Sequence, residues 1–240
     1  MLSGIALGSY LRIALPDHYT KDDSKDILIV AAGTMGTLIA LIIGLLVTSA
    51  KDTYDAANLR ITQGGAKVIT LDYYLSRYGT NAKRERELLR QAIASGIKRI
   101  WPDESSQGAD LAKMEKATEI ADVYNSIREL SPKNDSQMYL QTEALKLCAD
   151  IMQSRWLLIE ESQTDLPRIF FIILTFWLTV LFAQFGLLAP QNQAAKAALF
   201  VCTISMSSAI FLILELNHPL EGFIKIPSAP MQTVLALIGK

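Results

Sequence analysis

Long apolar stretches alternate with a strongly polar middle region along this 240-residue chain. No charged side chain occurs from Ile27 to Ala50, from Ile169 to Ala195 or from Ala197 to Leu214. A helix rises about 1.5 Å per residue, so about 20 apolar residues cross the roughly 30 Å of hydrocarbon in a bilayer. Each stretch meets or approaches that length, and the pattern therefore predicts three transmembrane helices.

A shorter apolar segment runs from Leu2 to Pro16. About 14 residues of helix extend only about 21 Å, and Arg12 lies inside the segment. It has no basic leader and no convincing small-residue cleavage site, so a removable signal peptide is the weaker interpretation. We expect a short, uncleaved first span, which makes three to four spans in all.

Most of the charge is concentrated in one segment. Between Lys51 and Arg168 lie 17 of the 23 Lys and Arg and 18 of the 24 Asp and Glu, so this segment is an almost neutral soluble domain. The predicted organisation is a first transmembrane hairpin at 1–50 (spans 2–16 and 27–50), a soluble domain at 51–168, a second hairpin at 169–216 (spans 169–189 and 195–216) and a tail at 217–240.

The soluble domain has the periodicity of helices. Apolar residues recur at threes, fours and sevens from 51 to 78, where the membrane helix continues and Gly64 and Gly65 interrupt it. Further helices are expected over 82–101, ended by Pro102, over about 109–130, and from about 137 toward the membrane. No strand-like alternation occurs in the sequence, so the predicted fold class is all-α.

Basic residues near the membrane ends predict the orientation. The soluble domain is flanked by Lys51, Arg60, Lys67, Arg155 and Arg168, whereas the short connection after the span at 169–189 offers only Lys196. The domain is therefore expected in the cytoplasm, and with four spans both termini are cytoplasmic as well.

Several functional classes find no support in the sequence. The net charge of −1 and the lack of a basic stripe argue against nucleic acid as a partner. His18 and His218 fall on opposite sides of the expected membrane, which excludes a metal shared between them. Cys148 falls in the soluble domain and Cys202 inside the last span, so no disulfide is expected between them, and neither has a second thiol at zinc-site spacing. Because phosphate-loop and hydrolase-elbow motifs are also missing, we expect no enzyme, no metal and no cofactor.

Small residues recur every four positions in the second span. They are Ala32, Gly36, Ala40, Gly44 and Thr48. Such residues allow another helix to approach closely, which is the more frequent role, or they line an axial pathway in an oligomer where bulk would block ions. The two interpretations are compatible if the helix packs on its neighbours around a ring.

The end of the last span, "FLILELNHPLEGFIKIPSAPM", contains a carboxylate among apolar residues. At the bilayer centre Glu215 would cost on the order of 2–3 kcal/mol, so it is expected at the cytoplasmic boundary. Asn217 suits a helix C-cap, Pro219 stops the helix, and Gly222 permits a reversal. The tail then lies along the membrane or against the soluble domain. A structural role for Glu215, by pairing or by capping backbone donors, is favoured over a place on a water-filled axis.

Four motifs in this order resemble the bacterial bestrophin-like membrane proteins, a family named for a domain of uncharacterised function. They are "HYTKDDSKD", "TLIALIIGLLVTSAKDTYDA", "WLTVLFAQFGLLAPQNQ" and "AIFLILELNHPLEGFIKI". Within them, the residues that carry most of the likeness are Trp177, Phe182, Phe185, Gly186, Pro190, Glu215, Leu216, Pro219 and Gly222. Asn217 and Leu220 stand where many such proteins have Asp and Phe, which weakens any role that needs a second carboxylate.

The resemblance implies kinship with bestrophins, which are pentameric anion channels with four spans per subunit and a helical cytoplasmic region. The leading hypothesis is a homo-oligomeric, multi-pass protein of the bacterial inner membrane that conducts anions. In the signature, Glu215, Asn217, His218, Pro219 and Gly222 organise the cytoplasmic end of the last span. The alternative is a membrane-anchored helical scaffold or sensor that binds a cytoplasmic partner without conduction.

Overall fold

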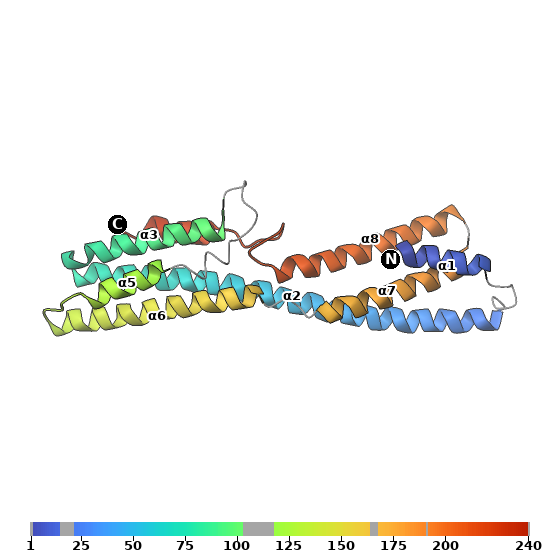
Figure 1. The fold of residues 1–240 in the computed structure, drawn as a ribbon, viewed down its shortest axis with the longest axis horizontal. Helices are drawn as coiled ribbons and strands as arrows, with labels where there is room; N and C mark the ends of the chain where they lie inside the picture. Colours follow the sequence, from blue (N-terminus) through green and yellow to red (C-terminus); the bar gives the residue numbers. More distant parts are fainter. Residues whose placement is uncertain (1, 15–21, 103–117, 164–167, 191, 240) are drawn as a thin grey trace. The chain divides into compact units, whose positions relative to one another are not determined.

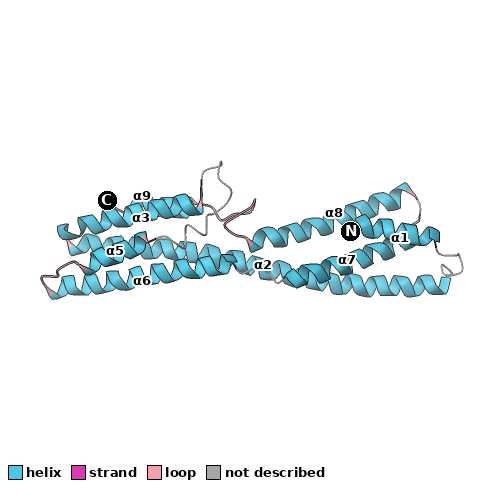
Figure 2. Cartoon of the chain, viewed as in Figure 1, coloured by secondary structure: helices cyan, strands magenta, loops and turns pink. Residues whose placement is uncertain are grey.

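The computed structural model describes residues 2–14, 22–102, 118–163, 168–190 and 192–239. Figure 2 shows helices joined by loops, and no strand occurs among these residues. The all-α prediction is confirmed. His18 and the first part of the helix expected at about 109–130 lie outside the described residues.

The chain divides into two units, each formed by separate segments. Unit 1 comprises Met1–Lys51 and Asp165–Leu214, and unit 2 comprises Asp52–Thr164 and Glu215–Lys240. The helices in chain order are α1 (Leu2–Ala14), α2 (Asp22–Tyr78), the short 3₁₀ helix η2 (Thr80–Ala82), α3 (Lys83–Ile100), α5 (Glu119–Arg128), α6 (Asp135–Gln163), α7 (Arg168–Leu188), α8 (Gln193–Asn217) and α9 (Ala229–Leu237) (Figure 1).

Three of the described helices are long and apolar enough to cross a membrane. They are the Lys25–Tyr78 part of α2, the Ile169–Leu188 part of α7, and α8. Their most apolar windows are mostly unburied within the chain, as expected for helices that face lipid or neighbouring subunits. Helix α1 has 13 residues, which corresponds to about 20 Å.

Glycines bring α1 into close contact with α7 in unit 1. A Cβ atom built on Gly4 would lie 2.5 Å from the carbonyl oxygen of Thr179, and one on Gly8 would collide with the carbonyl of Ala183. Gly186 of α7 faces α1 in the same way, because a Cβ there would lie 2.5 Å from the oxygen of Ile5. The two backbones therefore touch along a glycine seam, the packing that small residues permit in membranes.

Helix α2 runs without a break from the membrane stretch into unit 2. It has 57 residues, and the interruption predicted at Gly64 and Gly65 is wrong. A glycine inside a helix costs only about 1 kcal/mol relative to alanine, and packing in unit 2 outweighs this. At Gly65 the neighbour is α9, since a Cβ there would lie 2.9 Å from Val234 Cγ2.

Unit 2 has a hydrophobic core built from α2, α3, α5, α6 and α9. Its fully buried members include Leu71, Leu89, Val123, Ile127 and Cys148. The sequence periodicity predicted α3 correctly to its end before Pro102, and α6 begins two residues before its predicted start.

An ion pair joins α2 to α3 in unit 2. Arg86 donates to Asp72 through Nε at 2.8 Å and Nη2 at 2.9 Å, and Gly239 N–H donates to Asp72 at 3.3 Å. Asp72 is 8% exposed. The pairing therefore satisfies a buried carboxylate and holds the end of the C-terminal segment.

Candidate functional site

The five small residues of α2 do not share one environment. Ala32 is 5% exposed, on the same side of the helix as the buried Ile39, Ile43 and Ala50, whereas Ala40, Gly44 and Thr48 are exposed. A helix turns about 100° per residue, so a spacing of four drifts by about 40° at each step. The series therefore winds from the buried side at Ala32 to the open side at Thr48.

The later members of the series face space that this subunit leaves open. A Cβ atom on Gly36 or Gly44 would have no atom within 4 Å. Thr48 is satisfied within its own helix, because its hydroxyl donates to the Gly44 carbonyl at 3.0 Å. Their role in lining a pore or packing on a neighbouring helix stays a prediction.

Glu215 lies in the last turn of α8 and binds backbone of the loop that follows. Its Oε2 accepts hydrogen bonds from the N–H of Phe223 at 2.7 Å and of Ile224 at 3.2 Å. These charge-assisted hydrogen bonds direct the carboxylate to the backbone of the loop, so it does not have to face lipid. This is the geometry of the structural role expected for Glu215.

Gly222 makes room for this carboxylate. Its φ is +77°, in the left-handed region that favours glycine, and a Cβ there would collide with Glu215 Oε2. The conformation therefore favours glycine, and a side chain here would displace the carboxylate from its hydrogen bonds. We name the unit of Glu215, Gly222, Phe223 and Ile224 the carboxylate clasp.

The remaining signature residues close the loop between α8 and α9. The helix ends at Asn217, which is 7% exposed, and His218 N–H donates to the Glu215 carbonyl at 3.3 Å. The Pro219 carbonyl accepts from Ile226 N–H at 2.9 Å. The signature therefore forms a compact reversal after the last span.

The segment after this reversal packs within unit 2. Leu220 and Ile226 are buried in one cluster with Ala57, Ile61, Leu158 and Ile159. The indole of Trp101 donates to the Ile226 carbonyl at 2.7 Å. Of the two positions expected for the tail, the structure shows the one against the segment 51–168.

No group of three His, Cys, Asp or Glu that could hold a metal occurs in the part of the chain that the structure describes. Cys148 is buried in unit 2, Cys202 is exposed in unit 1, and neither forms a disulfide. Burial raises the pKa of the Cys148 thiol to about 12, so it stays protonated at neutral pH.

Sequence reasoning missed the glycine seam and α9. The signal for the seam was present, since Gly4 and Gly8 are four residues apart within an apolar segment. The signal for α9 was Ser228 ahead of Pro230, a helix-starting pair. The partners of Glu215 could not be identified, because they depend on how the loop folds.

Comparisons with known proteins agree with this architecture. The bestrophin-like domain family matches residues 2–231. A crystal structure of a mutant bacterial bestrophin homologue from Klebsiella pneumoniae superposes with a TM-score of 0.69 at 14% identity, covering 98% of this chain and 96% of that chain. Another crystal structure of a bacterial bestrophin homologue from that organism gives 0.65 at 16% identity with the same coverage.

These structural matches concern the fold, since the identities are low. A comparison with curated proteins gave no significant match. The family match covers nearly the whole chain, including the α2 series and the carboxylate clasp. The chain therefore belongs to the bestrophin-like family.

Proposed function

We propose that this protein is an anion channel of the bacterial inner membrane, formed by a ring of identical subunits. The observation that carries the proposal is the open side of α2, where Gly36, Ala40, Gly44 and Thr48 are left uncovered by the rest of the subunit. Family membership supports it, since the bestrophins that the chain resembles are pentameric channels. A ring of about five subunits is the expected assembly.

The small side chains suit an axial position for a steric reason. Around a ring axis, equivalent helices approach one another, and only small residues leave a passage that ions can enter. On a helix that faces only lipid, Gly would give up packing and helix stability without a benefit. The exposed glycines of α2 are therefore better explained by contact with a neighbour or by a pathway.

The carboxylate clasp removes an objection to anion passage. A ring of unpaired Glu215 side chains would attract cations and repel anions. Here Oε2 of Glu215 accepts from two backbone N–H groups, which offset its charge locally. The basic residues around the soluble domain favour a cytoplasmic position for unit 2 and for the C-terminal segment.

Flux through liposomes tests conduction. Wild-type protein reconstituted in liposomes is expected to pass chloride, and Gly44→Leu is expected to reduce the flux at least about tenfold by filling the open side of α2. Ala31→Leu is the matched control, because Ala31 is also exposed but lies about 140° around the helix from Gly44. It should keep wild-type flux.

The stoichiometry of the purified protein is measured by chemical crosslinking on the same preparations. Five subunits together with chloride flux support the channel. A monomer or dimer that passes no chloride would instead support the membrane-anchored scaffold or sensor. Equal loss of flux in Gly44→Leu and Ala31→Leu would contradict a specific role for the open side of α2.

A further inference from the structure

The loop between α8 and α9 carries an apolar tip that the proposed channel function does not use (Figure 1). In this tip Phe223 is 87% exposed and Ile224 is 36% exposed, and the exposed Lys225 follows them. The chain is buried on both sides of the tip, at Leu220 and at Ile226. The tip therefore projects from unit 2 with its apolar side chains outward.

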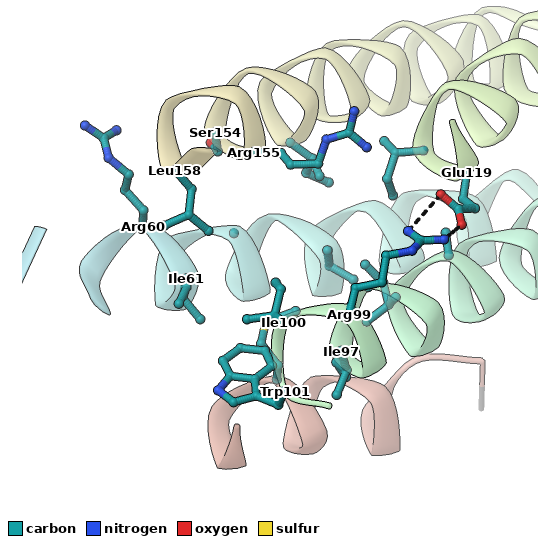
Figure 3. Close-up of a pocket in the computed structure, with 18 residues that line it drawn as sticks. Arg60, Ile61, Ile97, Arg99, Ile100, Trp101, Glu119, Ser154, Arg155 and Leu158 are labelled. Atoms are coloured by element: carbon teal, nitrogen blue, oxygen red, sulfur yellow. Dashed lines mark hydrogen bonds and ion pairs between the residues drawn. The ribbon is translucent and has the colours of Figure 1, made fainter. Parts of the chain in front are cut away.

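The carboxylate clasp fixes the backbone of this tip. Phe223 and Ile224 are the two residues whose N–H groups donate to Glu215, so their side chains stand on a backbone that hydrogen bonds hold in place. At the other end of the loop, the indole of Trp101 donates to the Ile226 carbonyl at 2.7 Å. Figure 3 shows this indole next to the end of α3. The exposure of the tip therefore belongs to a loop that is held at both ends.

The clasp also places the tip beside the end of a membrane-spanning helix. Helix α8 has 25 residues, which corresponds to about 38 Å, so it extends beyond the roughly 30 Å of hydrocarbon into the headgroup layer. Glu215 belongs to the last turn of α8, and the nitrogen of Phe223 lies 2.7 Å from its Oε2. The apolar side chains are therefore held at the level of the headgroups, within reach of the acyl chains.

The size and the charge of the tip fit a lipid surface better than a second protein surface. An aromatic side chain buries about 150–250 Å², so Phe223 and Ile224 together offer roughly 300 Å². A stable protein interface buries about 800 Å² on each partner. Glu221 and Lys225 stand on the two sides of the apolar pair with opposite charges, so attraction to anionic headgroups contributes little. The contact that the tip can make is therefore mainly apolar.

We propose that Phe223 and Ile224 dock this loop into the interfacial layer of a phospholipid bilayer. Their side chains enter the boundary between headgroups and acyl chains, whereas Glu221 and Lys225 stay on the aqueous side. The clasp holds the backbone that presents the two apolar side chains. The proposal concerns a single subunit, and it depends neither on conduction nor on the number of subunits.

Photo-crosslinking identifies what covers the tip. Phe223 is replaced by p-benzoylphenylalanine, a photoreactive phenylalanine, in the full-length protein reconstituted in phosphatidylcholine vesicles. After irradiation, intact-mass measurement is expected to show a phospholipid adduct at a yield at least about fivefold above that of the same replacement at Tyr139. Tyr139 is the matched control, because it is an aromatic residue that is 60% exposed on α6, and about 36 Å of helix separates it from Gln163 at the end of α6.

The same measurement separates lipid from the other possible occupants. A crosslinked product of twice the subunit mass in place of the lipid adduct would overturn the proposal, because a second copy of the chain would then cover the tip. A lipid yield equal to that of Tyr139 would overturn it as well. Addition of anionic phosphatidylglycerol is expected to change the yield by less than about twofold. An adduct that forms only in anionic vesicles would contradict an apolar contact.

Loss of the clasp tests how the tip is positioned. In Glu215→Ala the N–H groups of Phe223 and Ile224 lose their acceptor, and the lipid yield is expected to fall at least about threefold. Glu221→Ala removes an exposed carboxylate of the same loop outside the clasp, and it should keep the yield within about twofold. Circular dichroism and the elution volume establish that each variant is folded. An unchanged yield in folded Glu215→Ala would show that the clasp does not position the tip.

Discussion

Glycines inside helices meet opposite surroundings in the two units. In unit 1, Gly8 and Gly186 face the backbone of the neighbouring helix, which cannot move aside. In unit 2, Gly65 faces the end of the Val234 side chain, and Gly64 and Gly96 face open space. In unit 1, glycine therefore sets the distance between two helices. In unit 2, it leaves space that a neighbouring side chain can use or that stays open.

The difference follows from the solvent of each unit. In a bilayer, apolar side chains gain little free energy by moving from lipid into a helix interface. Helices α1 and α7 therefore associate through close backbone contact. In unit 2, the hydrophobic effect of burying side chains such as Leu71 and Leu89 holds the helices together. Glycine has no side chain and adds nothing to this hydrophobic free energy. Substitutions in each unit therefore probe different forces.

The largest effect is expected for Gly8→Leu. The new side chain would collide with the carbonyl of Ala183, so α1 must separate from α7 and the seam is lost. Overpacking of this kind destabilises by about 3 kcal/mol or more. Ala6→Leu, at an exposed position of the same helix, is the control. Thermal unfolding in detergent measures both, and equal melting temperatures would refute the glycine seam.

A smaller loss is expected for Gly222→Ala in the carboxylate clasp. Alanine at a φ of +77° is strained by about 1–2 kcal/mol, and its Cβ also displaces the Glu215 carboxylate. The free energy of unfolding, measured by denaturant titration, is expected to fall by about 2–4 kcal/mol in total. In a Glu215→Ala background the collision disappears, so Gly222→Ala should then cost only the strain. Strict additivity of the two changes would argue against the clasp.

Cys148 tests how well the core of unit 2 excludes water. Its pKa is raised from 9.0 to about 12, so the native thiol holds its proton where the unfolded thiol loses it. Stability from this group is complete below pH 9 and falls as the pH rises toward 12, by up to about 1.4 kcal/mol per pH unit. At pH 8 the thiolate population is about a thousandfold below that of an unshifted thiol.

Alkylation by iodoacetamide in a Cys202→Ser background measures this reactivity. The rate should stay low until denaturant unfolds unit 2. In Cys148→Ala, the free energy of unfolding should fall less between pH 9 and pH 12 than in the protein that retains Cys148. Rapid alkylation of the native protein at pH 8 would show that the core admits solvent.

The smallest effect is expected for Gly65→Ala. Its Cβ would lie 2.9 Å from Val234 Cγ2 and 3.4 Å from Met231 Sδ, and both are ends of side chains that can shift. The gain in helix propensity, about 1 kcal/mol, roughly offsets that adjustment. Denaturant unfolding should give a change within about 1 kcal/mol. A loss as large as that of Gly8→Leu would erase the distinction between the units.

Local features of the fold were readable from the sequence, and features that join distant segments were not. The apolar face of α3 and the stop at Pro102 are local, as is the end of α8 before Pro219. Gly64 and Gly65 misled the prediction for α2, because glycine lowers helix stability locally while the core of unit 2 restores it.

The candidate site shows the same limit. The position of Glu215 at a helix end followed from the cost of a carboxylate in lipid, but its partners at Phe223 and Ile224 depend on the path of the loop. The spacing of four in α2 does not keep to one face either, because a helix has 3.6 residues per turn and residues four apart are therefore rotated by about 40°. Burial of Ala32 and exposure of Gly44 reveal that winding.

The core of unit 2 joins Val68 and Leu71 to Val234 and Ile238, across more than half of the chain. During translation, the earlier residues leave the ribosome long before α9 exists. Closing so long a loop is slow compared with forming a helix. In the nascent chain, the apolar side chains of α2 and α3 that share this core with α9 therefore stay uncovered until α9 has been synthesised.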